Sequence, residues 1–294
     1  WHRRSAGAPH LPMLRSAASA AASGIEALAS RLAPVAAVTT SRAEAPWRRA
    51  VADFRALDAA AVVHGSRVTG LAREDSDVDV LTSVPLEAIV QRLQEPPMPP
   101  RFAVLENVRW ARIPRLILRH CSTGIEVDAV CGSVDSRATE RDEVTSLLLR
   151  QDARIRELAL LVGQWAKSHE PSMPPRLGFP NAYTFRLTAF HHLMVRPRGR
   201  LLPALAERGV SLAVPAPPVP TASAPGAGAS TEELFGEWLG RLSVADTEGL
   251  WVDLRRPWES GAGCNVVDPV SGQSLTRFRG SQLSTIAESG AGCN

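Results

Sequence analysis

In the sequence HGSRVTGLAREDSDVDV at residues 64–80, three aspartates alternate with other residues just behind a Gly-Ser turn. Alternate side chains of a strand share one face, so Asp75, Asp77 and Asp79 can point the same way. Like charges placed together repel one another unless cations neutralise them. Hard divalent cations such as Mg²⁺ prefer carboxylate oxygens, and two of them roughly 3.5–4 Å apart can hold the attacking and leaving oxygens of a phosphoryl transfer. The stretch therefore predicts a metal site, with an acidic surface turn as the alternative.

The turn itself, Gly65-Ser66, ends the short apolar run AAVVHG at residues 60–65. Glycine lets the backbone come close to a ligand, and exposed N–H groups with a serine hydroxyl can hold phosphate oxygens. A third acid is Asp128, at the centre of the predicted strand GIEVDAVCG at 124–132, whose neighbouring apolar residues bury the opposite face. One region of the chain thus combines a predicted anion cradle with predicted metal ligands.

The residues around this stretch predict a compact mixed α/β unit. Runs with strand composition and turn residues at their ends lie at 60–65, 78–84, 101–120 with a turn at Pro114, and 124–132. Helices are expected at 45–57, where Pro46 suits the first turn, and at about 86–93.

The residues after Glu140 follow the period of amphipathic helices instead. Apolar residues from Val144 to Trp165 recur at helical spacing, and further helices are expected at 182–195 and 232–242. Between the last two, the Pro/Ala/Gly-rich segment 214–230 has no means of building a core and predicts a surface loop. The predicted fold class is α+β, with a mixed α/β unit followed by a mostly helical part.

The composition is that of a packed globular protein of one large or two ordinary domains, with 294 residues of which 45% are hydrophobic. Because 33 basic residues nearly cancel 30 acidic ones, a polyanionic partner must be met by local arginine clusters. Such clusters lie at 109–119, 196–200, 255–256 and 277–279. The four cysteines show neither CxxC spacing nor a histidine at zinc-ligand distance, which argues against a disulfide scaffold or structural zinc. No apolar run approaches the roughly 20 residues of a membrane helix, so no membrane association is expected.

Residues 1–44 are expected to form an N-terminal extension, with a helix at 14–32 that packs on the helical part. The first residues are rich in Arg, Ala and Ser, and no acidic residue precedes Glu26, which suits an organellar transit peptide. The expected location is intracellular, in the cytoplasm or nucleus, with the mitochondrion as an alternative. The sequence ESGAGCN occurs at both 259–265 and 288–294 and carries no functional weight.

Several motifs, taken in their order along the chain, resemble one protein family. The segment GSRVTGLAREDSDVDV is similar to the nucleotidyltransferase signature of the DNA polymerase beta superfamily, a Gly-Ser followed about ten residues later by Asp-x-Asp. The segment ARIPRLILRHCSTGIEVDAV resembles the third-carboxylate region of its non-canonical poly(A) polymerase and terminal uridylyltransferase branch. LALLVGQWAKSHE, NAYTFRLTAFHHLM and VVDPVSGQSLTRF resemble that branch's Trp-Ala-Lys helix, nucleotide-stacking helix and C-terminal Asp-Pro segment. Together these matches cover most of residues 60–280.

For catalysis, the resemblance implies that Asp77 and Asp79 are the paired metal ligands and that Asp128 is the third carboxylate, which helps to activate an RNA 3′-hydroxyl. Two Mg²⁺ or Mn²⁺ ions are the implied cofactors. Asp75 matches no ligand of the family and is expected to be a turn residue.

For the nucleotide, the resemblance implies that Gly65 and Ser66 hold the triphosphate and that Lys167 neutralises its outer phosphates. Tyr183, the one tyrosine in the chain, would stack on the base. The implied organisation is a polymerase-beta-like nucleotidyltransferase catalytic domain at 45–145 and a helical poly(A) polymerase-associated domain at 146–294, with the nucleotide in the cleft between them.

Three positions depart from the family pattern. Gly163 stands where a second lysine is frequent one helical turn before Lys167, Ala182 where a phosphate-binding serine is usual, and Ser274 where an asparagine is common. In uridylyl-specific members a histidine in the Asp-Pro segment favours uracil, and here no histidine follows His192. The sequence thus favours ATP, with UTP as the alternative.

The expected function is the template-independent addition of AMP or UMP to an RNA 3′ end, with the RNA chosen by basic surface or by a protein partner. Two alternatives remain at this stage. One is a catalytically inactive RNA-binding homologue, which the departures at Gly163, Ala182 and Ser274 would favour. The other is a nucleotidyltransferase of small molecules, of the type that modifies antibiotics, which shares the Gly-Ser and Asp-x-Asp core.

Overall fold

The computed structural model describes residues 45–95, 101–108, 113–132, 137–171, 179–197, 199–203, 205, 228–243, 250–258 and 264–278. The helix expected at 14–32, most of the loop expected at 214–230 and most of both ESGAGCN copies lie outside these residues.

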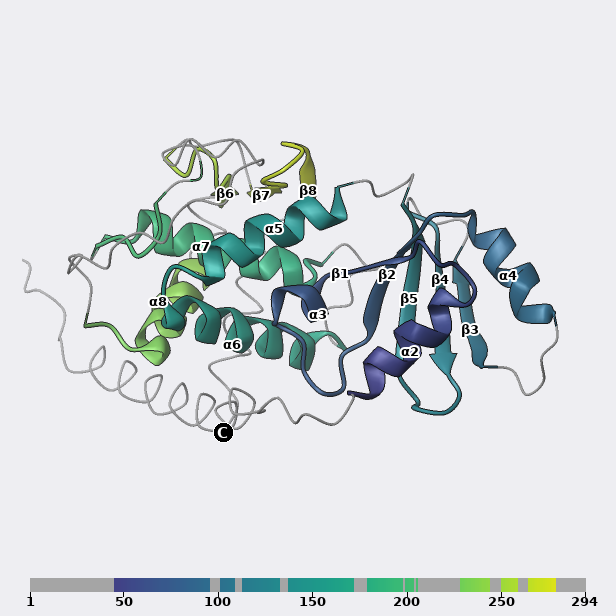
Figure 1. Ribbon diagram of the computed structural model, residues 1–294. Coiled ribbons are helices and arrows are strands. Elements are labelled where there is room, and N and C mark those ends of the chain that lie inside the picture. Colours follow the sequence, from purple (N-terminus) through teal and green to yellow (C-terminus); the bar gives the residue numbers. More distant parts are fainter. Residues whose placement is uncertain are drawn as a thin grey trace, which may run out of the picture.

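A five-stranded mixed sheet forms one end of the molecule (Figure 1). Its strands are β1 (Val62–His64), β2 (Val78–Thr82), β3 (Phe102–Val108), β4 (Arg115–His120) and β5 (Glu126–Cys131), in the order β1-β2-β5-β4-β3. The pair β2–β5 is parallel and the other pairs are antiparallel. The central position of β2 and β5 explains why Val78, Val80, Val127 and Ala129 are fully buried.

Two helices, α2 (Pro46–Arg55) and α4 (Leu86–Gln94), cover this sheet. Pro46 occupies the first turn of α2, where a missing N–H costs nothing, and Phe54 and Ile89 bury the apolar faces of the two helices against the strands. The predicted α/β unit is therefore confirmed in its strands and helices, each within a few residues of the expected bounds.

The other end of the molecule is a helical bundle of α5 (Ala138–Leu149), α6 (Ala153–His169), α7 (Ala182–Val195) and α8 (Thr231–Ser243) (Figure 1). Its core contains Trp165 and Trp238, whose rings meet edge to face with centroids 5.3 Å apart. The side chains of Asp152 and Asn181 cap α6 and α7 by accepting hydrogen bonds from backbone N–H groups two and three residues ahead. The helical prediction for this part of the chain is confirmed.

Two elements were not anticipated. One is α3 (Ser66–Thr69), a single helical turn that lies between the sheet and the bundle. The other is a three-stranded sheet of β6 (Trp251–Val252), β7 (Cys264–Val267) and β8 (Ser274–Phe278). These strands are too short for a strand period to emerge from the sequence, and a tight turn at Gly272, with φ of +74°, joins β7 to β8.

None of the helices described here combines the length and the apolar character needed to cross a membrane.

Candidate active site

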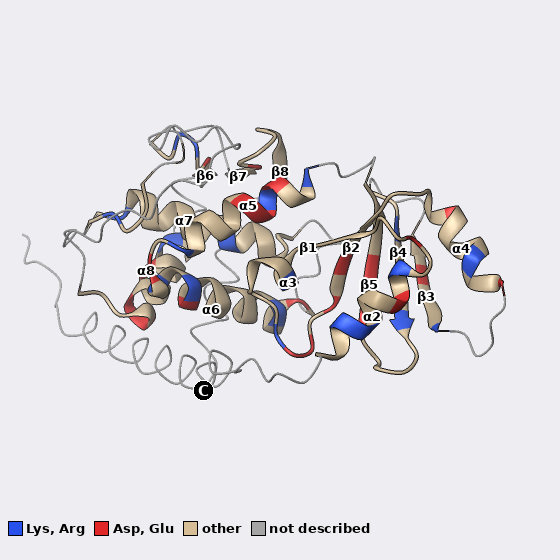
Figure 2. Cartoon of the chain, viewed as in Figure 1, with Lys and Arg blue, Asp and Glu red and all other residues tan. Residues whose placement is uncertain are grey.

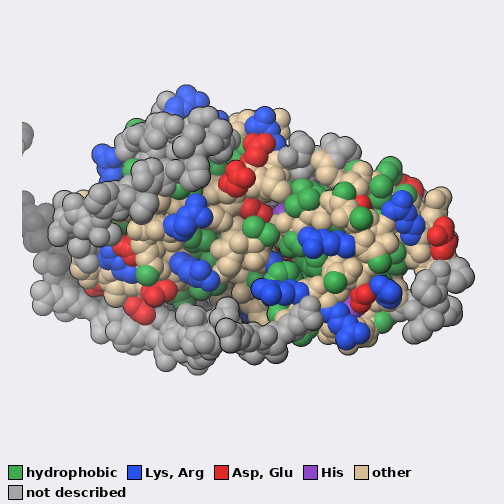
Figure 3. Space-filling view, viewed as in Figure 1, with side chains coloured by type: hydrophobic (Ala, Val, Ile, Leu, Met, Phe, Trp, Pro, Cys, Tyr) green, Lys and Arg blue, Asp and Glu red, His purple; other side chains and the backbone are tan. Residues whose placement is uncertain are grey.

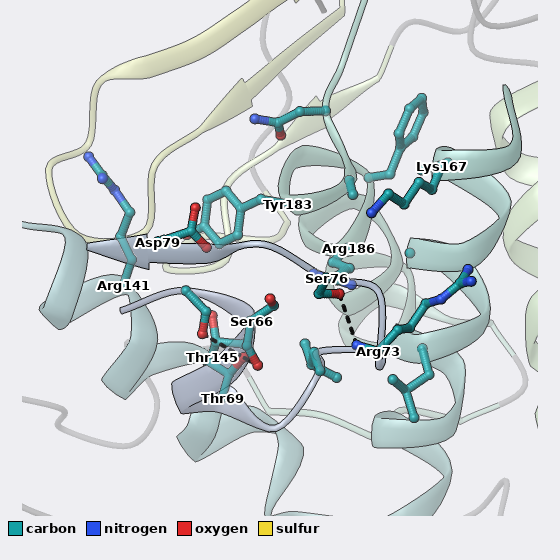
Figure 4. A pocket seen from close by; sticks show the side chains of 18 of the residues that line it. Ser66, Thr69, Arg73, Ser76, Asp79, Arg141, Thr145, Lys167, Tyr183 and Arg186 are labelled. Atoms are coloured by element: carbon teal, nitrogen blue, oxygen red, sulfur yellow. Dashed lines mark hydrogen bonds between the residues drawn. The ribbon is translucent and has the colours of Figure 1, made fainter. Parts of the chain in front are cut away.

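A cavity of about 440 Å³ opens where the sheet meets the bundle, within the size range of small-molecule sites. The loop around α3, the residues before and within β2, and one face each of α5, α6 and α7 line it (Figure 4). Of the residues predicted from the sequence, it brings together Gly65, Ser66, Asp77, Asp79, Lys167 and Tyr183. Side chains more than 100 residues apart in the sequence therefore share one cavity.

Asp128, the remaining predicted residue, lies beside this group on the neighbouring strand. In the parallel pair β2–β5, Asp79 stands directly opposite Asp128, so the two side chains share one face of the sheet. Figure 2 shows these acidic positions side by side on β2 and β5. Asp77 precedes β2 by one residue and lies on the same side as Asp79.

The electrostatics of this group disfavour full ionisation. Burial first, and then the negative charges of Asp77 and Asp128, raises the pKa of Asp79 to about 7. Burial also raises the pKa of Asp128, although the nearby guanidinium of Arg115 lowers it in part. A bound cation would remove this mutual repulsion.

Arg115 was not anticipated from the sequence, although it lies within the strand that pairs with β5. Its Nη1 is 3.0 Å from Asp128 Oδ2, while Asp128 Oδ1 is buried without a hydrogen-bond partner in the described part of the chain. The arginine thus partly neutralises Asp128.

Both the backbone conformation and the available space require glycine at position 65. Its φ of +75° is one that residues with a side chain rarely adopt, and a Cβ there would lie 2.2 Å from Asp79 Oδ2. The glycine therefore allows the backbone of the α3 turn to press directly against the carboxylate.

Two backbone donors of this turn already have acceptors. The Gly65 N–H donates to Asp142 Oδ2 at 2.6 Å, and the Ser66 N–H donates to the Asp79 carboxylate. Asp142 is a buried acid on α5, 77 residues from Gly65, and no local sequence pattern connects the two. The Ser66 hydroxyl is therefore the group of this turn best placed to meet a phosphate.

The loop that carries Asp77 is held by Arg67 on α3. Arg67 donates to the carbonyl oxygens of Glu74, Ser76 and Asp77. Within the loop, Ser76 Oγ accepts a hydrogen bond from the Arg73 N–H at 2.9 Å (Figure 4). Asp75 forms an exposed ion pair with Arg73, which fits the turn residue expected there.

On the opposite wall, Lys167 extends from α6 and Tyr183 from the first turn of α7 (Figure 4). Asn181 caps α7 directly before Ala182, and its Oδ1 is 2.9 Å from the Thr184 N–H. The cap fixes the start of the helix and with it the direction of Tyr183. Gly163 and Ala182, the two departures from the family pattern in this region, both line the cavity.

The Asp-Pro segment reaches the cavity through an arginine. Buried Asp268 accepts a hydrogen bond from Arg141 Nε at 2.9 Å, and Arg141 lines the cavity from α5. Ser274 donates to Asn265 within the small sheet, at 2.6 Å between Oγ and Oδ1. His191 and His192 are buried in α7 outside the cavity, as expected for packing residues.

The residues fit a divalent cation in chemistry but are not yet arranged around one. In the described ranges no three His, Cys, Asp or Glu side chains are close enough together to hold a metal ion. The buried Asp128 Oδ1, which has no hydrogen-bond partner among the described residues, and the raised pKa of Asp79 both fit hard oxygen donors for a divalent cation.

Comparisons with known proteins agree with this geometry. The profile of the nucleotidyltransferase domain family matches residues 47–111, whereas no curated protein sequence matches the chain. Among solved structures, that of Cid1 with its short product ApU has a TM-score of 0.62 at 18% identity, covering 90% of each chain. Apo mtPAP has a TM-score of 0.69 at 17% identity, covering 99% of this chain and 72% of its own. The GLD-2/RNP-8 complex has a TM-score of 0.64 at 16% identity, covering 90% of this chain and 93% of that one.

The family match covers the Gly-Ser turn and the Asp-x-Asp motif, and the structural matches extend the same fold through the helical bundle. The fold that the motifs imply is thereby confirmed: residues 47–111 match the nucleotidyltransferase domain family, and the chain shares the fold of the Cid1, mtPAP and GLD-2/RNP-8 structures.

Proposed function

We propose that the protein is a template-independent RNA 3′-terminal nucleotidyltransferase, which adds AMP or UMP from a nucleoside triphosphate to an RNA 3′-hydroxyl and releases pyrophosphate. The observation that carries this proposal is the placement of Asp79 opposite Asp128, at the edge of a cavity that Ser66, Lys167 and Tyr183 also line. Acidic ligands, phosphate-binding groups and an aromatic ring thus surround one space.

Asp77, Asp79 and Asp128 would hold two Mg²⁺ or Mn²⁺ ions. When bound, such ions neutralise the phosphates and make the RNA 3′-hydroxyl a better nucleophile. The chain's own groups position the substrate: Tyr183 offers a ring on which a base can stack, and Lys167 supplies a positive charge for the outer phosphates. The cavity walls from the sheet and from the bundle hold the two reactants in one orientation.

The choice of base remains between ATP and UTP. We favour ATP because no histidine follows His192 to select uracil. The fold alone does not decide the matter, since mtPAP has been crystallised with ATPγS, with GTP and with UTP.

RNA would be held by basic surface, by a protein partner or by both. Figure 3 shows Lys and Arg side chains spread over both halves of one face instead of gathered in a single patch. Such a distribution supports backbone contacts without sequence selection. The GLD-2/RNP-8 structure contains a second protein, which supports a partner as the source of RNA choice here.

We also propose that the catalytic domain spans 45–145 and the helical poly(A) polymerase-associated domain 146–294. Two separate hydrophobic clusters support this division, one built on residues 50–129 and one mainly on residues 144–270. Leu71, from the loop after α3, belongs to the second cluster and ties the catalytic loop to the bundle.

The competing function, an inactive RNA-binding homologue, is favoured by one observation: the Arg115–Asp128 ion pair neutralises a predicted metal ligand. A small-molecule nucleotidyltransferase is disfavoured because the Lys167 and Tyr183 segments and the Asp-Pro segment all converge on the cavity region.

The proposal is tested by incubating the purified protein with 5′-labelled single-stranded RNA, Mg²⁺ or Mn²⁺, and each of the four nucleoside triphosphates separately. Extension with ATP or UTP supports the proposal and decides the base. Transfer to an aminoglycoside that RNA does not compete would instead show the small-molecule enzyme. RNA binding with no transfer to either acceptor would show the inactive homologue.

A further inference from the structure

Two of the positively charged side chains that line the cavity are available to a ligand. The positively charged residues that line it are Arg73, Arg141, Lys167 and Arg186. Arg73 is neutralised by Asp75, with 3.0 Å between Nε and Oδ1. Arg141 is neutralised by Asp268 at 2.9 Å. Within the described ranges, no ion pair includes Lys167 or Arg186. The free positive charge thus comes from two facing helices, α6 and α7.

Arg186 is held in a defined place on the cavity wall. It follows Tyr183 by three residues on α7, so the two side chains share one helix face (Figure 4). Its Nε donates to the Ala159 carbonyl of α6 at 3.1 Å, which anchors the near side of the guanidinium. Burial lowers the pKa of Arg186 to about 10, so the group is still charged at neutral pH. A fixed, partly desolvated guanidinium attracts an anion more strongly than a solvated one.

Gly163 provides the space that the guanidinium occupies. A Cβ on Gly163 would lie 2.2 Å from Arg186 Nη2 and 2.9 Å from its Cζ. A side chain at position 163 would therefore clash with Arg186 in its observed position. Glycine is among the least favourable residues in a helix interior, so its presence within α6 is explained by this approach of the guanidinium.

Resting on the proposed function, we propose that Arg186 binds the triphosphate of the incoming nucleotide together with Lys167, and that Gly163 permits this by leaving room for the guanidinium. The planar guanidinium can donate two parallel hydrogen bonds to phosphate oxygens, whereas the ammonium of Lys167 acts as a point charge. A clamp of this kind favours a triphosphate over a monophosphate, whichever base is attached. Arg186 on α7 then makes the phosphate contact that a lysine at position 163 on α6 would otherwise make.

Binding measurements test the clamp. Dissociation constants for ATP, UTP and AMP would be measured by calorimetry in Mg²⁺ for the wild type, Arg186→Gln, Gly163→Ala, Arg186→Ala and Gly163→Ala/Arg186→Ala. Arg186→Gln should weaken ATP and UTP binding by about tenfold or more, and AMP binding much less, since a charge-assisted phosphate contact is lost. As a single substitution, Gly163→Ala should weaken triphosphate binding. Added to Arg186→Ala, it should have no effect on triphosphate binding.

A matched control is Arg92→Gln, which removes an arginine that also bonds a backbone carbonyl but lies on α4, outside the cavity. It should leave all three dissociation constants unchanged. Thermal melting without nucleotide shows whether each variant is folded.

The outcomes distinguish failure of the clamp from failure of the proposed function. If the wild type binds ATP or UTP and Arg186→Gln binds it equally well, the clamp is wrong and the proposed function stands. If Arg186→Gln weakens AMP and triphosphate binding equally, Arg186 has only a structural role between the helices, and the clamp is again wrong. If the wild type binds neither triphosphate, the proposed function and the clamp both fail.

Discussion

Replacing Asp79 by asparagine should stabilise the metal-free protein while it abolishes nucleotide transfer. The pKa of Asp79 is about 7, against 3.8 for an unperturbed aspartate, so the folded state holds this proton more tightly than the unfolded state does. The three-unit difference corresponds to about 4 kcal/mol, an upper limit for the destabilisation by ionised Asp79 above pH 7. Asparagine removes the charge and still offers an oxygen to the Ser66 N–H.

The sign follows from proton binding. Between pH 3.8 and about 7 the folded wild type binds more protons than the unfolded chain, so the contribution of Asp79 to stability falls as the pH rises through that window. Asparagine at position 79 does not ionise, so the stability of Asp79→Asn does not fall for this reason as the pH rises. The melting temperature of the variant should therefore exceed that of the wild type at pH 8 by several degrees, at about 2–4 °C per kcal/mol for a chain of this size, and the difference should shrink toward pH 4.

The assay is thermal unfolding in EDTA and again with excess Mg²⁺ or Mn²⁺. In EDTA the variant should melt higher, whereas the added ion should raise the melting temperature of the wild type and not that of the variant. A variant that is less stable than the wild type in EDTA at pH 8 would show that the buried carboxylates do not repel one another, contrary to this prediction.

Three further predictions concern the turn, the loop and the bundle. Gly65→Ala should lower the free energy of unfolding by more than about 1 kcal/mol and abolish transfer, since its Cβ would meet Asp79; an active variant of normal melting temperature would contradict this. Arg67→Gln should reduce kcat with little change in the melting temperature, because it frees the loop before β2; unchanged kcat in single-turnover extension would contradict it. Burial lowers the pKa of His191 and His192 to about 4, so between pH 6.5 and 4 the unfolded chain binds more protons than the folded protein. The urea concentration at the midpoint of unfolding should therefore decrease as the pH falls from 6.5 to 4. A double substitution of the two histidines by glutamine that keeps the same pH slope would disprove their role.

The sequence predicted the elements whose periodicity is strong. The alternation in β2 and β5 and the helical spacing in α6 and α8 each reflect burial of one face, which is a local property of the chain. The adjacency of Asp79 and Asp128 came from the family resemblance, because no local pattern states which strands pair. The small sheet and α3 were missed since each of their elements is too short to establish a period.

The site residues that were missed depend on contacts distant in sequence. Asp142 meets Gly65 across 77 residues, and Arg115 meets Asp128 across 13. Arg186 is placed by a carbonyl of α6, 27 residues earlier. A charged residue within a mostly apolar helix is a signal that could have marked Arg186 in α7. Asp142 carries no such signal, because it lies among Glu140, Arg141 and Glu143 in the polar first half of α5. Neither sequence pattern reveals the partner of the residue.

The central claim is that three carboxylates on neighbouring strands perform nucleotidyl transfer to RNA. Its most direct test is the extension of a labelled RNA by the wild type beside Asp77→Ala/Asp79→Ala and Asp128→Asn, with melting curves to show that each protein is folded. We expect extension by the wild type alone. Extension by a folded variant that lacks these carboxylates, or none by a folded wild type that binds both RNA and nucleotide, would contradict it.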